Sequence, residues 1–353
     1  MFTKKIPLFY TVLFVLVCSV GSFYLATRMN NNTTEIQEKK IVTPATAAAQ
    51  PECVYGITRL SGYRRVSPIM TADQECESEK LMPLKLTLSS YIEHEQLAGN
   101  VINASVYVRR LVDDGWMNIN PRDVFHPASL LKVPQMIAYL KKAETDRGLL
   151  DREYLFEKSY DDMPKQYYSA KTLQPGHKYS VKELFRFMIV YSDNNANIEL
   201  VNRMDMNVFN NTFKALHLAP PNLTDYSYQI GTRDYSRFLE LLYNASYLSI
   251  DASEYATELL ANAAFKDGIV KKLPKNTGVA HKMGEWGDGN EVELHDCGIV
   301  YVEGNPYIIT VMTRGKDMEH LSDLIGNISL MTFDAMQSPD LKPHEAVATT
   351  PAP

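Results

Sequence analysis

The chain has 353 residues, a formal net charge of −6 and 45% hydrophobic residues. This length allows one large domain with appendages or two small domains, and the composition is that of an ordinary globular protein. A mildly acidic chain without a concentrated basic stripe argues against nucleic acid as a partner.

An apolar run from Ile6 to Ala26, about 21 residues, follows Lys4 and Lys5. About 20 apolar residues cross a bilayer as a helix, and the lysines in front of the run place the N-terminus in the cytoplasm. We therefore expect residues 1–29 to be a cytoplasmic stub and a single-pass membrane anchor. A cleaved signal peptide is the alternative, and in either case the rest of the chain is exported.

Residues 30–51 form a predicted linker, since they are polar and Ala/Thr/Pro-rich without a periodic apolar face. In the next segment, residues 52–80, Cys53 and Cys76 are expected to form a disulfide because the compartment is oxidising. Closing that loop of about 23 residues contributes about 3 kcal/mol. Cys297 then remains a free thiol, which is typically buried. No CxxC or HExxH spacing occurs, so we expect neither a metal site nor a cofactor.

One domain is expected over residues 81–337, and it opens with strands. Residues 104–108 and 115–119, separated by an Asp-Asp turn, predict a β-hairpin. Apolar residues at i, i+3, i+4 and i+7 over 133–140 then predict a helix. A capping box of Ser180 and Glu183 predicts the start of another helix.

Helical patterns continue over residues 234–244 and 253–264, and strands return after them. These strands are expected at 279–283, 292–302 and 307–313, with a last amphipathic helix over 318–337 and a disordered tail over 338–353. Strands at both ends with helices between them predict an α/β (α+β) fold. One antiparallel sheet is then built from both ends of the domain, with helices packed on its faces.

The first chemical motif is Ser129-Leu130-Leu131-Lys132. Pro127 is favourable at a helix start, so Ser129 lies at a helix N-terminus, where partial positive charge accumulates. Lys132 follows one turn later on the same face. A serine hydroxyl becomes a good nucleophile when a base takes its proton, and an enclosed lysine with a lowered pKa can be that base. Taken alone, the motif is more typical of a helix-start serine and a solvated lysine than of a catalytic pair.

Two further motifs follow in the chain. Ser192-Asp193-Asn194 comes after a predicted helix and supplies a hydroxyl that can relay a proton and an amide that can hold a carbonyl. His281-Lys282-Met283-Gly284 lies on a predicted strand, where the lysine raises the local positive potential and the glycine allows close approach to the backbone. Each of them alone also fits a polar turn or an exposed strand.

Together, in this order and spacing, the motifs resemble those of the penicillin-recognising serine enzymes, especially class A β-lactamases. The resemblance covers about residues 81–337, including the strand at 294–301. It implies a five-stranded antiparallel sheet with helices on both faces and a helical subdomain. It also implies that Ser129 is the acylated nucleophile, Lys132 the general base and Ser192 the proton shuttle.

The same resemblance assigns the substrate-binding residues. Asn194 binds the substrate amide, and Asn197 matches a further asparagine of the family. Lys282 becomes the electrostatic partner of Ser192 and of the substrate carboxylate. The oxyanion hole consists of the backbone N–H of Ser129 and a second one near Gly284 or Glu285, and losing one such donor typically costs about 2.7–4 kcal/mol.

Two departures from the family pattern stand out. Met283 replaces a hydroxyl residue that donates a hydrogen bond to the β-lactam carboxylate, which weakens binding by about 1.5–3 kcal/mol. Class A β-lactamases also use a glutamate, on a loop after the second motif, to activate the deacylating water. The corresponding residues 219–229 contain no glutamate, although Asp225 or Tyr228 could substitute. Without that base, the acyl-enzyme should form and hydrolyse slowly.

We therefore expect a monomeric serine hydrolase, anchored in a bacterial cytoplasmic membrane, that acts outside the cytoplasm. It is expected to be acylated at Ser129 by a β-lactam or a peptidoglycan-like amide. One alternative is a D-alanyl-D-alanine peptidase or penicillin-binding protein that works on peptidoglycan stem peptides. The other is a non-catalytic envelope-binding or sensor domain that keeps the fold.

Overall fold

The computed structural model describes residues 54–60, 62–63, 65–160, 166–168, 170–223, 227–287 and 290–341. All of them lie in one compact unit, Cys53–Pro353. The predicted anchor and linker fall outside this part of the chain. Within it, no helix combines the length and hydrophobicity needed to span a membrane.

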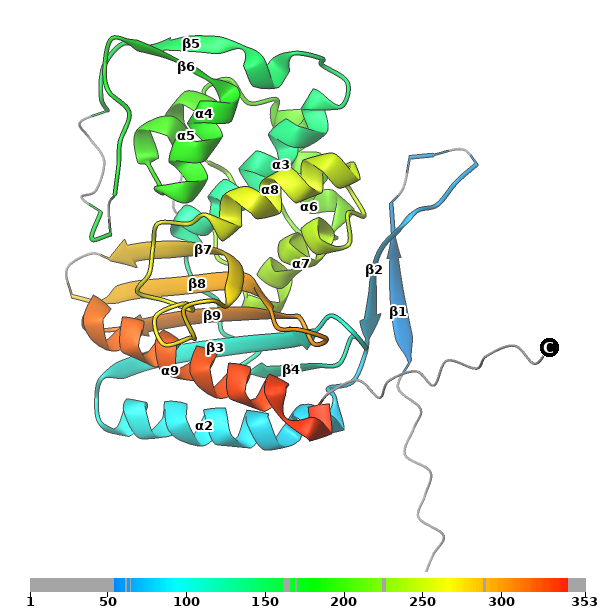
Figure 1. Cartoon of the computed structure of the whole chain (residues 1–353), viewed down its shortest axis with the longest axis vertical. Coiled ribbons are helices and arrows are strands. Elements are labelled where there is room, and N and C mark those ends of the chain that lie inside the picture. Colours follow the sequence, from blue (N-terminus) through cyan, green and yellow to red (C-terminus); the bar gives the residue numbers. More distant parts are fainter. Residues whose placement is uncertain are drawn as a thin grey trace, which may run out of the picture. The chain divides into compact units, whose positions relative to one another are not determined.

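A five-stranded antiparallel sheet forms the centre of the domain, and it confirms the predicted topology (Figure 1). The first two strands of the sheet come from the start of the domain and the other three come from its end, in the spatial order β4-β3-β9-β8-β7. Their bounds are β3 Val101–Arg110, β4 Trp116–Ile119, β7 Gly278–Gly287, β8 Val292–Tyr301 and β9 Tyr307–Gly315. This order makes β7, which carries the third motif, an edge strand.

Two long helices cover one face of the sheet, α2 (Met82–Leu97) and α9 (Met318–Gln337). Their apolar residues join those of the strands in one buried cluster. Asp317 begins α9 as its N-cap, since its carboxylate accepts the backbone N–H of His320 at 2.9 Å.

The other face of the sheet packs on a helical subdomain with a second buried cluster. Its helices are α3 Lys132–Ala143, α4 Val181–Phe185, α5 Asn194–Val201, α6 Met206–Ala215, α7 Thr232–Tyr243 and α8 Ile250–Ala261. Shorter elements are the helices η1 Glu79–Leu81, η2 Ala128–Leu131, η3 Leu149–Asp151, η4 Arg186–Val190 and η5 Pro339–Leu341, and the ribbon of β5 Glu153–Phe156 with β6 His177–Ser180. The capping box predicted at Ser180 and Glu183 begins α4.

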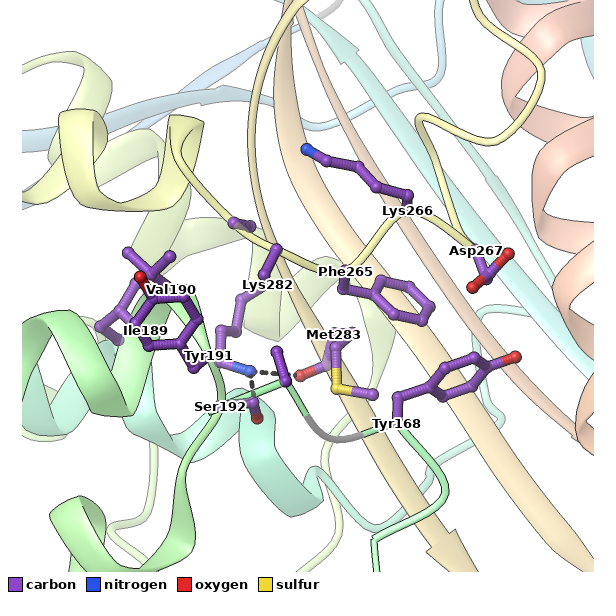
Figure 2. Close-up of a pocket in the computed structure, with 13 residues that line it drawn as sticks. Tyr168, Ile189, Val190, Tyr191, Ser192, Phe265, Lys266, Asp267, Lys282 and Met283 are labelled. Carbon is purple, nitrogen blue, oxygen red and sulfur yellow. Dashed lines mark hydrogen bonds between the residues drawn. The ribbon is translucent and has the colours of Figure 1, made fainter. Parts of the chain in front are cut away.

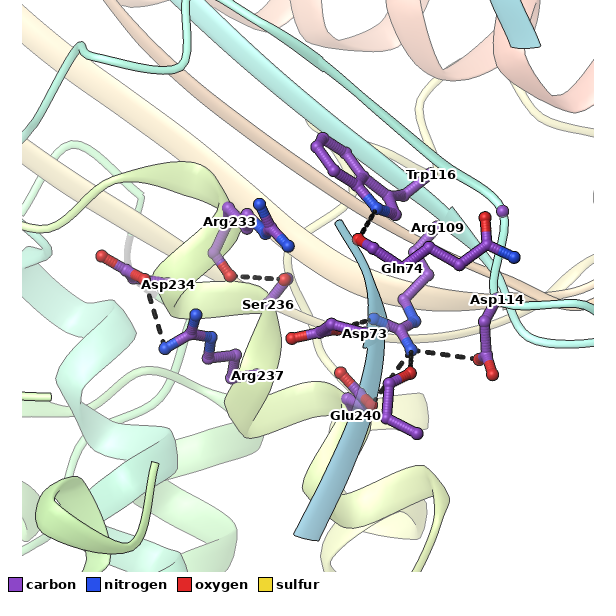
Figure 3. A network of polar contacts seen from close by, with 12 residues as sticks. Asp73, Gln74, Arg109, Asp114, Trp116, Arg233, Asp234, Ser236, Arg237 and Glu240 are labelled. Carbon is purple, nitrogen blue, oxygen red and sulfur yellow. Dashed lines mark hydrogen bonds and ion pairs between the residues drawn. The ribbon is translucent and has the colours of Figure 1, made fainter. Parts of the chain in front are cut away.

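The segment ahead of the domain folds into a β-hairpin of β1 (Tyr55–Arg59) and β2 (Ile69–Gln74). It is fixed to the domain by Arg109 of β3, which is 2% exposed and forms ion pairs with Asp73, Asp114 and Glu240 (Figure 3). Cys76 is disulfide-bonded. Its proposed partner Cys53 lies outside the described residues, so that pairing stays a prediction.

The last described residues pack against the domain. Leu341 of η5 is 5% exposed, and its carbonyl accepts a hydrogen bond from Asn305 at 3.2 Å. The first residues of the predicted tail, 338–341, are therefore ordered, and residues 342–353 lie outside the described part. Cys297 is buried in β8 as a free thiol, as predicted.

Candidate functional site

Ser129 lies in a tight turn at the start of the helix pair η2 and α3. Ala128 before it has the left-handed φ of 47°, and the backbone N–H of Leu130 donates to the carbonyl of Pro127 at 2.9 Å. The Tyr235 hydroxyl donates to the carbonyl of Leu130 at 3.1 Å. Ser129 itself is partly exposed. Left-handed non-glycine residues are strained and concentrate at functional sites, so this turn makes Ser129 a candidate reactive residue.

The loop that leads into this turn is fixed by two buried side chains of β8. Glu293 accepts the backbone N–H of His126 at 3.0 Å, and His295 Nε2 lies 2.9 Å from the carbonyl of His126. The backbone N–H of Thr313 donates to His295 Nδ1 at 3.2 Å, so Nε2 carries the proton and donates. The His126 ring also stacks on Trp286 of β7 at 4.4 Å. The approach to Ser129 is therefore rigidly tied to the sheet.

Gly284 lets the edge strand β7 approach the Ser129 turn. A Cβ atom at Gly284 would lie 2.7 Å from the carbonyl oxygen of Pro127 and 2.9 Å from Cγ of Leu130. Both distances are shorter than van der Waals contact, so only glycine fits. The third motif is thus placed directly against the first.

We expect Gly284→Ala to lower the free energy of unfolding by about 1–3 kcal/mol, because the new methyl group would clash with the backbone carbonyl of Pro127, which cannot move aside easily. Gly278→Ala is the matched control on the same strand. Its Cβ would meet Tyr301 at an ordinary 3.5 Å. Urea denaturation of both variants measures the difference, and an equal effect at the two positions would contradict the close approach.

Lys132 is buried and points into the site rather than into solvent. It is 2% exposed. Its Nζ donates to the carbonyl of Ser192 at 2.7 Å and to Oδ1 of Asn194 at 2.8 Å, and it lies 3.4 Å from Oγ of Ser192. The solvated lysine that the motif alone would allow is therefore excluded.

Lys282 reaches the same hydroxyl from β7. Its Nζ donates to Oγ of Ser192 at 2.8 Å and to the carbonyl of Met283 at 2.9 Å (Figure 2). The Ser192 hydroxyl therefore stands between two buried amines, those of Lys132 and Lys282. The structure brings residues of all three motifs into one hydrogen-bonded group.

Burial lowers the pKa values of both amines, and the charge of Lys282 lowers that of Lys132 further. Desolvation and the neighbouring charge of Lys282 hold the pKa of Lys132 well below its usual range, although Asp193 and Glu285 oppose the shift. Desolvation lowers the pKa of Lys282 to about 7, against the opposing effect of Asp296 and Glu285. Because its pKa is lowered and it follows Ser129 by one turn, the Lys132 amine is suited to accept the Ser129 proton.

Ser192 owes its position to an irregular helix end. The helix before it is α-helical through Phe185 and then widens to the π-helix η4. Ser192 adopts a left-handed φ of 55°, and the backbone N–H of Asp193 donates to the carbonyl of Phe187 at 3.0 Å. Asp193 in turn caps α5 by accepting the backbone N–H groups of Asn195 and Ala196. π-Bulges are frequent at functional sites, and this one turns the Ser192 hydroxyl toward both lysines.

Asn197 and Glu285, two of the predicted substrate-binding residues, make no hydrogen bond to Lys132 or Ser192 among those described. The buried Oδ1 of Asn197 has no hydrogen-bond partner in the described part of the chain, so Asn197 does not join the group around Lys132. The Glu285 carboxylate accepts the backbone N–H groups of Tyr167 and Tyr168 at 2.9 and 3.1 Å. The predicted roles of Asn197 and of the backbone at Gly284 and Glu285 stay predictions.

A cavity of about 210 Å³ lies beside Ser192 and Lys282 (Figure 2). Met283, Tyr168 and Phe265 line it, and the rings of Tyr168 and Phe265 meet edge to face with centroids 4.7 Å apart. Sequence reasoning did not identify these two aromatic residues, because neither lies in a recognisable motif. Met283 forms part of this apolar wall, so the wall has no hydroxyl at that position.

The loop expected to supply a deacylating base has no carboxylate in its described residues, 219–223 and 227–229. Asp225 lies outside them. Tyr228 is half-buried and packs against Phe213, and desolvation raises its pKa to about 12. A phenol with this pKa stays protonated at neutral pH and is a poor base. Among the described residues, no group of acidic, histidine and cysteine side chains could hold a metal ion.

Comparisons with known proteins identify the family of the chain. The family model described as the beta-lactamase enzyme family matches residues 87–336. No curated protein sequence matches the chain.

Solved structures share the fold at low sequence identity. A PBP-A mutant, solved as an acyl-enzyme complex with penicillin G, is 22% identical over 72% of this chain and 97% of its own, with a TM-score of 0.61. The TLA-1 extended-spectrum β-lactamase is 19% identical over 74% and 100%, with a TM-score of 0.63. A class A β-lactamase from Bacteroides cellulosilyticus is 20% identical over 72% and 98%, with a TM-score of 0.60.

Proposed function

We propose, from the premise that the chain belongs to the beta-lactamase enzyme family, that it is a serine hydrolase acylated at Ser129. The observation that carries this proposal is the burial of Lys132, which follows Ser129 by one helical turn. Its Nζ donates hydrogen bonds to the carbonyl of Ser192 and to Oδ1 of Asn194. A serine with a neighbouring amine of lowered pKa is an activated nucleophile. The substrates we propose are β-lactams or peptidoglycan-like amides.

In the proposed acylation, Lys132 and Ser192 transfer protons one after the other. Neutral Lys132 takes the proton of Ser129 as Oγ attacks the carbonyl carbon of the substrate amide. The C–N bond then breaks, and Ser192 donates its hydroxyl proton to the leaving nitrogen. Ser192 regains a proton from the Lys132 ammonium, so the dyad returns to its starting state and the acyl group remains on Ser129. Lys282 supplies the positive charge that favours an anionic substrate group beside Ser192.

We further propose that the acyl-enzyme hydrolyses slowly. Water needs a general base to attack the ester efficiently, and residues 219–223 and 227–229 offer no carboxylate. This observation favours a D-alanyl-D-alanine peptidase or penicillin-binding protein as the second candidate function. PBP-A, a protein of the same fold, forms an acyl-enzyme with penicillin G as a mutant.

The decisive experiment is covalent labelling of the full chain, purified in detergent, with a fluorescent penicillin. We expect one adduct, located on Ser129 by peptide mass spectrometry and absent from Ser129→Ala. A label that decays over hours indicates slow deacylation, whereas decay within seconds indicates an efficient β-lactamase. If wild type and Ser129→Ala are labelled equally, or neither is labelled, the proposal is wrong.

We also propose that the domain works outside the cytoplasm, held there by the apolar run at residues 6–26. The disulfide at Cys76 supports this location, because disulfides persist in oxidising compartments. Protease added to intact cells should digest the domain if it faces outward, and protection of the domain would place it inside.

A further inference from the structure

Glu285 occupies the position directly after the K-x-G motif on the edge strand β7. Its carboxylate binds two consecutive backbone N–H groups, those of Tyr167 and Tyr168, at 2.9 and 3.1 Å. These partners come from a segment that precedes β7 by more than 100 residues in the chain. One side chain thus ties a separate segment to the strand that carries Lys282.

The segment tied in this way reaches the catalytic group. Gln166 Nε2 donates to the carbonyl of Ser192 at 3.1 Å, and Lys132 Nζ donates to the same oxygen at 2.7 Å. At its other end, the Tyr168 ring packs on Phe265 and lines the cavity beside Lys282. Residues 166–168 therefore form a wall of the site at one end and contact the Ser192 backbone at the other.

We infer that Glu285 is a positioning residue of the reaction, which holds residues 166–168 across the site and so keeps the Ser192 carbonyl and the Tyr168 wall in place. This inference rests on the proposed acylation of Ser129 and adds a residue to it. The Glu285 carboxylate also faces the charges of Lys282 and Lys132, whose ammonium forms it stabilises. Glu285 therefore has two separable effects, one through its hydrogen bonds and one through its charge.

Glu285→Gln and Glu285→Asp separate the two effects. The glutamine carries no charge, and its NH₂ group cannot accept the second backbone N–H. The aspartate keeps the charge, but one methylene less prevents it from reaching both N–H groups. Glu285 is only partly buried, so both variants should fold. Glu303→Gln, at an exposed turn between β8 and β9, is the matched control for loss of a charge.

The first measurement needs no substrate. Hydrogen exchange of the full chain in detergent, followed by mass spectrometry of peptides that contain residues 166–168, should be faster in both Glu285 variants by about tenfold or more. Hydrogen bonds to charged groups are strong enough for an effect of this size. Glu303→Gln should exchange like the wild type.

The second measurement is the rate of penicillin acylation against pH. In Glu285→Gln we expect about a tenfold lower maximal rate of acylation. We also expect the rise of the rate with pH to occur at lower pH, because the ammonium form of Lys132 has lost a stabilising charge and its pKa falls. In Glu285→Asp the maximal rate should fall, while the pH at which the rate rises should stay the same. A purely structural role would not shift the pH at which the rate rises.

These outcomes separate the inference from the proposed function. If wild-type protein is not acylated but hydrogen exchange at residues 166–168 is faster in the Glu285 variants, the proposed acylation is wrong. The structural role of Glu285 in holding residues 166–168 is then still supported. If wild type is acylated, and both exchange and the pH profile of Glu285→Gln match those of Glu303→Gln, the inference is overturned.

Discussion

Replacing Lys132 with alanine is expected to slow the acylation of Ser129 by about 10²–10⁴-fold, the range in which a positioned general base contributes. The reason is geometric and electrostatic. Lys132 is buried one turn after Ser129, and its amine has a pKa held well below the usual range by desolvation and by Lys282. Stopped-flow measurement of acylation by a fluorescent penicillin checks this expectation.

The pH dependence of the wild-type rate identifies the same base. A rate that needs neutral Lys132 rises with pH through the lowered pKa of that amine. The positive charge of Lys282 is lost as pH rises through about 7, so binding of an anionic substrate weakens above that value. We therefore expect a bell-shaped profile with its maximum below the range of ordinary lysines.

Lys142→Ala is the matched control for the Lys132 variant, since it removes an amine from the same helix α3. Lys142 is 39% exposed and pairs with Asp205 at 2.9 Å, so its loss should leave acylation within a factor of two. Thermal unfolding of both variants verifies that they are folded. A folded Lys132→Ala protein that is acylated at the wild-type rate would exclude Lys132 as the base.

Much of this site follows from local sequence patterns. The spacing of Ser129 and Lys132 places them one turn apart on any helix, and the observed η2–α3 start has this geometry. The two ends of the domain were predicted to form one sheet from strand patterns and chain order, and the strand order confirms it. The helix and strand patterns depend on residues within a few positions of one another, which sequence periodicity encodes. The pairing of the two ends follows from the order of strands and helices along the chain.

Other parts of the site depend on contacts between distant segments and could not be predicted. Nothing in the sequence around Glu285 indicates that its carboxylate binds the backbone of Tyr167 and Tyr168, because that contact forms only when the domain folds. The same holds for His295, because its strand is predicted from local pattern but its hydrogen bond to the carbonyl of His126 is not. Burial of Lys132 is likewise a tertiary property, since the same motif on a surface helix would leave it solvated.

The stability of the molecule should depend strongly on Arg109, at the junction of the N-terminal hairpin and the sheet (Figure 3). Its guanidinium is 2% exposed and faces three carboxylates, those of Asp73, Asp114 and Glu240, of which Glu240 is 3% exposed. Arg109→Met keeps the apolar stem and leaves these carboxylates without their cation. Removing one partner of a buried ion pair typically costs about 3–5 kcal/mol.

The pH dependence of this loss has a definite sign. Desolvation raises the pKa of Glu240 to about 7, although Arg109 opposes the shift. A carboxyl whose pKa is raised on folding stabilises the native state below its unfolded value, about 4.5, and this contribution is lost as pH rises through 7. In Arg109→Met the Glu240 pKa should rise further. The variant should therefore lose more stability at pH 8, where Glu240 must either ionise without a partner or bind a proton from a basic solution, than at pH 5, where it is protonated in any case.

Urea denaturation of the full chain in detergent at pH 5 and pH 8 measures both effects. Arg152→Ala is the control, because Arg152 is 49% exposed and pairs with Asp146 at the surface, where such a pair contributes about 1 kcal/mol or less. We expect Arg109→Met to lose about 3–5 kcal/mol at pH 8 and less at pH 5, with Arg152→Ala nearly unchanged at both. Equal losses in the two variants, or a larger loss for Arg109→Met at pH 5, would mean that the hairpin is held by its apolar contacts, chiefly the buried Met70, and not by the charges around Arg109.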